Sequence, residues 1–258
     1  MAKTDPTSRH DSAKPPVKGG TVPQKGTGGA VASSKSDIQN FLQKASKITP
    51  ADGRAGLVFA MDATMSRQHT WDEAQHIQAQ MFDAVDATVG LDIQLVYFRG
   101  FGECRASRFV DNAADLRDLM TQIDCRGGRT QIGKVLAHTR KESAARSKSK
   151  TASSKVSALV YVGDAMEEDL DLLCDKAGEL GLLGVPCFVF QEGHDPAAEQ
   201  AFREIARLSN GAFMRFGPGS ASKLAELLKA VARFAGGGRR ALEASGSRED
   251  RLLLEQMK

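Results

Sequence analysis

The feature that most constrains the fold is a set of four largely apolar runs separated by longer amphipathic segments. The runs occupy residues 57–61, 91–98, 156–162 and 185–190. A short run with little polar alternation is typical of a strand buried on both faces of a sheet. Strands of this kind that are joined through helices form parallel sheets. The pattern therefore predicts an α/β fold with a doubly wound, mostly parallel central sheet and helices on both faces.

The segments between the runs carry apolar residues at helical spacing. We expect helices over residues 72–89, 113–123, 132–139, 170–180, 197–208 and 224–234. Residues 104–110 alternate in polarity after a glycine-rich turn, which predicts one short antiparallel edge strand, and residues 212–216 are the last predicted strand. Residues 140–155 are strongly basic and break the pattern. We expect the preceding helix to end there in an exposed, mobile loop.

The two ends of the chain differ from this pattern. Residues 1–36 are rich in Lys, Gly, Pro, Ser and Thr and poor in large aliphatic residues, so we expect a disordered, mildly basic arm. Residues 37–53 are predicted to form a short flanking helix and a linker, and the main domain is predicted to span 54–235. A glycine triplet is expected to end it, which leaves 236–258 as a charged tail whose leucine cluster either binds a partner or docks back.

Composition narrows the class of protein. The chain has 258 residues, of which 41% are hydrophobic, and its formal net charge of +3 does not by itself indicate nucleic acid as a partner. The four cysteines form no C-x-x-C pair, so neither a zinc site nor a disulfide framework is expected. No apolar run approaches the ~18 residues of a membrane helix, and no hydrophobic signal region follows Met1. We therefore expect a soluble cytoplasmic protein without membrane contacts.

Oxygen-bearing side chains follow two of the apolar runs. Asp62, Thr64 and Ser66 come directly after residues 57–61, and Asp164 follows residues 156–162. In open parallel sheets, ligands bind beyond the carboxyl ends of the strands, so these residues and the 127–130 loop are expected at one edge. Carboxylate and hydroxyl oxygens are hard ligands of the kind that Mg²⁺ prefers. The same residue types also favour turns and helix N-caps, which is the structural alternative.

The set Asp62-Ala63-Thr64-Met65-Ser66, Gly128-Arg129-Thr130 and Gly163-Asp164 resembles the metal-ion-dependent adhesion site of von Willebrand factor A domains. The family pattern is D-x-S-x-S, then a threonine, then an aspartate, each on a separate loop. The resemblance covers about residues 54–235, and this chain departs from the pattern at Thr64, which keeps a hydroxyl. It implies the Rossmann-like fold of that family.

The resemblance further implies a site for Mg²⁺ (or Mn²⁺) and a function without catalysis. Thr64, Ser66 and Thr130 would offer hydroxyls, and Asp62 and Asp164 would supply charge, directly or through water. An Asp or Glu carboxylate of another protein would complete the coordination. Family members also work beside AAA+ ATPases, so such an ATPase is a candidate partner. Four positions are the predicted partner contacts: Arg67, Gly102, Arg129 and Glu167.

Other chemistries remain as alternatives. The sequence from Gly128 to Val135 matches G-x-x-x-x-G-K, but no apolar strand precedes it and Val135 replaces the metal-binding hydroxyl of a phosphate loop. Gly133-Lys134 is therefore expected inside a helix. Asp62 could instead be the nucleophile of a metal-dependent phosphoryl-transfer hydrolase, although Thr64 stands where a second aspartate would act as acid or base. A third alternative is nucleic-acid binding by the basic arm and residues 140–155, with the domain as a scaffold.

Overall fold

The computed structural model describes residues 54–68, 91–148, 155–216 and 221–257. All of these belong to one structural unit, Pro50–Lys258. The predicted arm (1–36), the flanking segment (37–53) and the predicted helix at 72–89 lie outside the described residues. Across the described ranges, no helix combines the length and the apolar character that a membrane crossing requires.

The described strands form one six-stranded sheet in the order β3-β2-β1-β4-β5-β6. Their bounds are β1 Ala55–Asp62, β2 Leu91–Arg99, β3 Glu103–Val110, β4 Val156–Gly163, β5 Cys187–Glu192 and β6 Ala212–Phe216. Every neighbouring pair is parallel except β2 and β3, which form an antiparallel hairpin at one edge. The predicted α/β class, the mostly parallel sheet and the antiparallel edge strand are therefore confirmed.

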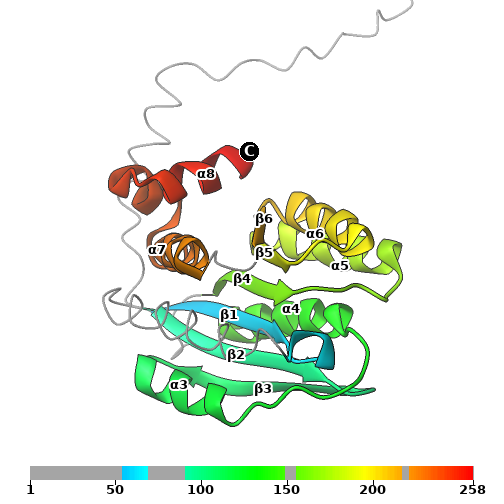
Figure 1. Ribbon diagram of the computed structural model, residues 1–258. Helices are drawn as coiled ribbons and strands as arrows, with labels where there is room; N and C mark the ends of the chain where they lie inside the picture. The colour runs from blue at the N-terminus through cyan, green and yellow to red at the C-terminus, as the bar shows by residue number, and fades with distance from the viewer. Residues whose placement is uncertain (1–53, 69–90, 149–154, 217–220, 258) are drawn as a thin grey trace, which may run out of the picture. The chain divides into compact units, whose positions relative to one another are not determined.

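Helices cover both faces of the sheet, as predicted (Figure 1). One face packs on α4 (Ile132–Lys148), α5 (Leu170–Leu182) and α6 (Pro196–Leu208), and the other on α3 (Ala113–Thr121) and α7 (Ala221–Ser245). The last helix, α8 (Arg248–Gln256), packs on α7. Successive strand residues point to opposite faces, which divides β1 between the two cores: Leu57, Phe59 and Met61 on the α3 and α7 side, Val58 and Ala60 on the other.

The helix that was expected to end within the basic stretch 140–155 extends through Lys148. Side-chain contacts, both long-range and within the helix, hold the last turns in place. The guanidinium of Arg146 pairs with Asp92 at 3.1 Å and lies 4.2 Å from the centroid of the Phe109 ring. The Ser147 hydroxyl donates to the carbonyl of Ser143 at 2.8 Å. Basic composition alone did not indicate these contacts, and residues 149–154 lie outside the described ranges.

The predicted domain end at residue 235 falls inside α7. This helix continues through the glycine triplet and kinks at Gly238, whose φ of 65° is readily adopted only without a Cβ. The segment after the kink packs on the domain, and Leu242 and Leu253 are buried in its core. Of the two alternatives for the tail, the structure therefore contains the docked one.

Candidate metal centre

The carboxyl ends of the adjacent strands β1 and β4 bring two aspartates to one place. Met61 pairs with Val162 across these strands; Asp62 is the next residue of β1, and Asp164 follows Gly163 at the end of β4. The Asp62 side chain has no exposed area, and its Oδ1 accepts a hydrogen bond from the Thr64 amide at 2.7 Å. Asp62 Oδ2 and Asp164 Oδ1 are buried and have no hydrogen-bond partner among the described residues. A buried carboxylate oxygen without a donor is unusual and calls for a positively charged ligand or a water.

The two hydroxyls predicted beside Asp62 face each other. Thr64 Oγ1 and Ser66 Oγ are 3.0 Å apart, and Thr64 is buried while Ser66 is exposed. The amide of Arg126 donates to the Ala63 carbonyl at 3.0 Å, and Thr64 and Arg126 form an isolated parallel bridge. The loop after β1 is thus fixed to the segment that leads toward Thr130.

Thr130 is joined to the loop that carries Asp164. The Glu167 amide donates to Thr130 Oγ1 at 3.0 Å, and the Thr130 amide donates to Glu167 Oε2 at 3.1 Å. Glu168, the next residue, accepts hydrogen bonds from Ile132 N and, at 2.9 Å, from Gly133 N. These carboxylates satisfy amides at the start of α4 that have no partner within the helix. Glu167 therefore positions Thr130, a role that the sequence did not indicate.

Arg67 lies differently from its predicted place at a partner surface. Its side chain has no exposed area. The guanidinium donates through Nε to Glu192 Oε2 at 2.9 Å and through Nη1 to the backbone carbonyl of Asp62 at 2.9 Å. Because these contacts bury it beneath the loop, Arg67 supports the site and does not face a partner. By contrast, Gly102, Arg129 and Glu167 are exposed.

The electrostatics of the site favour a cation. The pKa of Asp62 is raised from 3.8 to about 6, chiefly by burial and also by the charge of Asp164. Hydrogen bonds from Thr64 and the charge of Arg67 lower this pKa, but they do not outweigh the burial. Arg67 contributes little because its guanidinium bonds the Asp62 carbonyl and not its carboxylate. Two carboxylates that are desolvated and near each other are unfavourable without a cation between them.

The glycines of the 127–130 loop explain how Thr130 reaches this edge. A Cβ on Gly128 would lie 2.0 Å from the Gly100 carbonyl oxygen, so only glycine permits this approach. The neighbouring Arg129 amide donates to the same oxygen at 3.1 Å. Gly133 and Lys134 lie inside α4, as predicted, and the Lys134 ammonium donates to the Gly102 carbonyl at 3.0 Å. This segment is therefore not a phosphate loop.

The donors fit a hard divalent cation. They comprise two carboxylates with unsatisfied buried oxygens and the hydroxyls of Thr64 and Ser66, with Thr130 tied to the same loops. Oxygen donors with few charges are typical of Mg²⁺ sites. Within the described ranges, no cluster of three or more His, Cys, Asp or Glu side chains forms an alternative metal site. The Asp62, Thr64, Ser66 and Asp164 set is thus the group that a cation would join.

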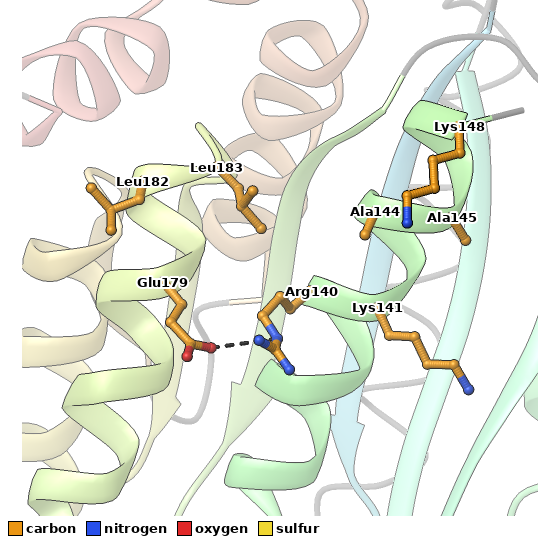
Figure 2. Close-up of a pocket in the computed structure, with 8 residues that line it drawn as sticks. All are labelled: Arg140, Lys141, Ala144, Ala145, Lys148, Glu179, Leu182 and Leu183. Carbon is orange, nitrogen blue, oxygen red and sulfur yellow. Dashed lines mark ion pairs between the residues drawn. The ribbon is translucent and has the colours of Figure 1, made fainter.

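An open groove of about 810 Å³ lies elsewhere, between α4 and α5 (Figure 2). Basic side chains and small or aliphatic ones line it, and Arg140 pairs with Glu179 across it at 3.4 Å. None of its lining residues belongs to the predicted site. The groove and the metal centre are therefore separate features.

The fold has solved counterparts. The chain superposes on a von Willebrand factor type A protein from Catenulispora acidiphila with a TM-score of 0.54 and 14% identity, over 72% of this chain and 43% of that one. The SpRpn10 VWA domain gives a TM-score of 0.54 and 12% identity, over 66% of this chain and 93% of that one. Proximal thread matrix protein 1 from the mussel byssus, with zinc at its metal-ion-dependent adhesion site, gives a TM-score of 0.55 and 20% identity. This match covers 71% of this chain and 48% of that one.

These likenesses establish the fold class: the described domain has the fold of von Willebrand factor A domains. The chain spans less than half the length of the Catenulispora and mussel proteins. No protein-family model matches the sequence, and no curated protein sequence matches it. The family resemblance seen in the sequence is therefore confirmed at the level of the fold.

Proposed function

We propose that this chain is a divalent-metal-dependent protein-interaction module. In this proposal Asp62, Thr64, Ser66, Thr130 and Asp164 hold Mg²⁺ or Mn²⁺. The observation that carries it is the pair of buried carboxylate oxygens, Asp62 Oδ2 and Asp164 Oδ1, that have no hydrogen-bond donor among the described residues. A cation bound between them would satisfy both oxygens and offset the burial and the repulsion from Asp164 that raise the pKa of Asp62.

The partner in this proposal supplies an Asp or Glu carboxylate. The five proposed donors would leave one position of an octahedral Mg²⁺ site open, so the bound metal could accept a further carboxylate. Ser66 is exposed beside buried Thr64, which leaves the metal position reachable from solvent on that side. The resemblance to the family makes an AAA+ ATPase one class of partner to test.

The metal half of the proposal is tested by thermal unfolding in EDTA, Mg²⁺ and Mn²⁺. A ligand at 100 times its Kd stabilises the folded state by about 2.7 kcal/mol, so a clear rise in Tm is expected for the wild type. Asp62→Ala, Asp164→Ala and the milder Ser66→Ala should reduce or abolish the rise. Asp118→Ala, an exposed change on α3, is the matched control and should keep it. Equal shifts in all five proteins would contradict the site.

The partner half is tested by recovering bound proteins in Mg²⁺ and in EDTA, followed by Asp→Asn and Glu→Gln changes in the recovered partner. We expect one carboxylate of the partner to be essential, and Ser66→Ala to weaken the same interaction. Binding that persists in EDTA would contradict a bridging cation.

The phosphoryl-transfer alternative is tested separately. Asp62 has no exposed area, which disfavours it as a nucleophile. Turnover of general phosphatase substrates in Mg²⁺ that is lost in Asp62→Asn would support the enzyme and contradict the interaction module.

A further inference from the structure

Two large apolar side chains are exposed beside the candidate metal centre. Phe101 is 87% exposed at the turn between β2 and β3, and Met65 is 54% exposed between Thr64 and Ser66. The other exposed large apolar residues among those described lie on or just after α5: Leu172, Leu182 and Leu183. Neither Phe101 nor Met65 was among the predicted partner contacts. Their exposure contributes nothing to the core, so folding does not explain them.

The strand register places these two side chains at the same edge. Asp62 pairs with Phe98 across β1 and β2, and the Ala63 amide donates to the Phe98 carbonyl at 3.0 Å. Met65 and Phe101 each follow their strand's paired residue by three positions. Figure 1 shows η1 (Met65–Arg67) and the β2–β3 turn at the same end of the sheet. The two residues therefore belong to the edge of the sheet that carries Asp62.

The turn that carries Phe101 is held firmly. The carbonyl of Gly100 accepts from the Arg129 amide at 3.1 Å, and that of Gly102 accepts from the Lys134 ammonium at 3.0 Å. Gly100 also packs directly against Gly128, two residues before Thr130. The ring is thus presented on a fixed support that is continuous with the Thr130 loop. A preorganised aromatic loses little conformational entropy on binding, and such residues often dominate the energy of protein interfaces.

The charge at this edge complements an acidic ligand. Arg129 is exposed one residue before Thr130, whereas the nearby Arg126 pairs with Asp124 at 3.1 Å. A divalent cation at Asp62 and Asp164 would cancel the negative charge of these two carboxylates, which would otherwise repel an acidic ligand. Apolar and positively charged groups therefore lie side by side at the rim of one site.

We infer that the partner presents its carboxylate next to a large apolar residue, and that Phe101, assisted by Met65, is the specificity determinant for that residue. This inference rests on the proposed function. The ligand class is a protein segment in which Asp or Glu stands within a few positions of Leu, Ile, Met or an aromatic residue. The carboxylate joins the metal, and the apolar side chain covers the Phe101 ring.

Selection from a displayed library of random peptides in Mg²⁺ tests the inference. The wild type should enrich peptides that contain an acidic residue near a large apolar one, and EDTA should release them. Phe101→Ser should enrich acidic peptides without the apolar preference, and should weaken a wild-type-selected peptide by about ten- to thirtyfold. Leu182→Ser, which removes an exposed apolar residue on the far helix α5, should match the wild type.

The possible results distinguish a failure of this inference from a failure of the proposed function. If Phe101→Ser retains the apolar preference while acid and Mg²⁺ dependence persist, the inference is wrong and the proposed function stands. If the wild type shows no Mg²⁺-dependent acidic selection, both are wrong. Ser66→Ala should weaken every selected peptide, whatever its apolar residue, because it acts on the metal.

Discussion

Asp62 and Asp250 are both aspartates without exposed area, yet their surroundings differ completely. Asp250, in the first turn of α8, accepts hydrogen bonds from the Ser247 hydroxyl at 2.7 Å and from the Arg233 guanidinium at 2.8 Å. Burial alone would raise the pKa of Asp250, but hydrogen bonds from Ser245, Ser247 and Arg233 outweigh it and lower the value. For Asp62, burial prevails and raises the pKa to about 6.

The comparison separates two uses of a buried charge. Asp250 completes a capping box and pairs with the guanidinium of Arg233, so its ionised form is satisfied within the fold. Asp62 keeps one oxygen without a donor among the described residues. A carboxylate that the folded chain desolvates but leaves incompletely satisfied is a candidate ligand for something outside the chain. Matched substitutions at the two positions should therefore affect stability in opposite directions.

The largest effect is expected at Asp250. Asp250→Asn removes the charge that pairs with Arg233 and weakens the cap of α8, so the free energy of unfolding should fall by about 2–4 kcal/mol. Urea denaturation measures this loss. The rise in Tm on adding Mg²⁺ should remain, because the α7–α8 contact does not include a site residue. An unchanged free energy of unfolding would show that the contacts of Asp250 with Arg233 and Ser247 do not stabilise the fold.

A smaller effect of opposite sign is expected at Asp62. In EDTA at pH 7.5, Asp62→Asn should raise the free energy of unfolding by about 1–3 kcal/mol, because it removes a desolvated charge while an amide oxygen still accepts from Thr64 N. The variant should lose the Mg²⁺-dependent rise in Tm. Urea denaturation with and without Mg²⁺ measures both. If Asp62→Asn is less stable than the wild type in EDTA, the Asp62 charge does not destabilise the metal-free protein and the proposed difference from Asp250 is wrong.

The same contrast predicts a pH dependence for the metal-free protein. The pKa of Asp62 is higher in the folded state than its ordinary value of 3.8, so the folded state binds more protons between pH 4 and pH 6. The contribution of Asp62 to the free energy of unfolding is therefore fully present below pH 4 and is lost as the pH rises through 6. The difference between wild type and Asp62→Asn in EDTA should shrink from its full size at pH 7.5 to near zero at pH 4. A difference independent of pH would contradict the raised pKa.

The contribution of Asp250 to stability should depend on pH over a different range. Its pKa is lowered in the folded state, so its contribution is present above pH 3.8 and is lost only as the pH falls further. Between pH 7.5 and pH 5 the difference between wild type and Asp250→Asn should therefore be constant. Denaturation curves at these two pH values provide the matched control for Asp62.

The sheet and the ligand edge could be predicted because their causes are local. Buried parallel strands require apolar runs, and the carboxyl ends of such strands share one edge, so the positions of Asp62 and Asp164 followed from two short segments. The 127–130 loop was expected at the same edge, and the family resemblance then identified Thr130 within it as a candidate ligand. The edge strand β3 could be predicted from its polar alternation, because alternation is typical of a strand with one face exposed to solvent.

The supporting contacts could not be predicted because each joins distant residues. Arg67 reads as a surface residue until Glu192, 125 positions later, is seen to hold it. Glu167 contacts Thr130 across 37 positions, and Arg146 extends α4 through Asp92, 54 positions earlier. A charged side chain gives the same local pattern whether it faces solvent or a distant counterion. Phe101 was missed for a related reason, because an apolar residue in a turn does not show which way it points.

The smallest effect is expected at Thr64, where the sequence departs from the family pattern. Thr64→Ser keeps the hydroxyl that faces Ser66, so the metal-free stability should change by less than about 0.5 kcal/mol and the Mg²⁺-dependent rise in Tm should stay within error. Thr64→Val keeps the shape and removes the oxygen, so it should reduce that rise. The counterpart in α8 is Ser247→Ala, which removes an N-cap and should destabilise the protein by about 1 kcal/mol without changing the metal response. A metal response equal in Thr64→Val and Thr64→Ser would exclude this hydroxyl as a ligand and leave the cation to the remaining donors.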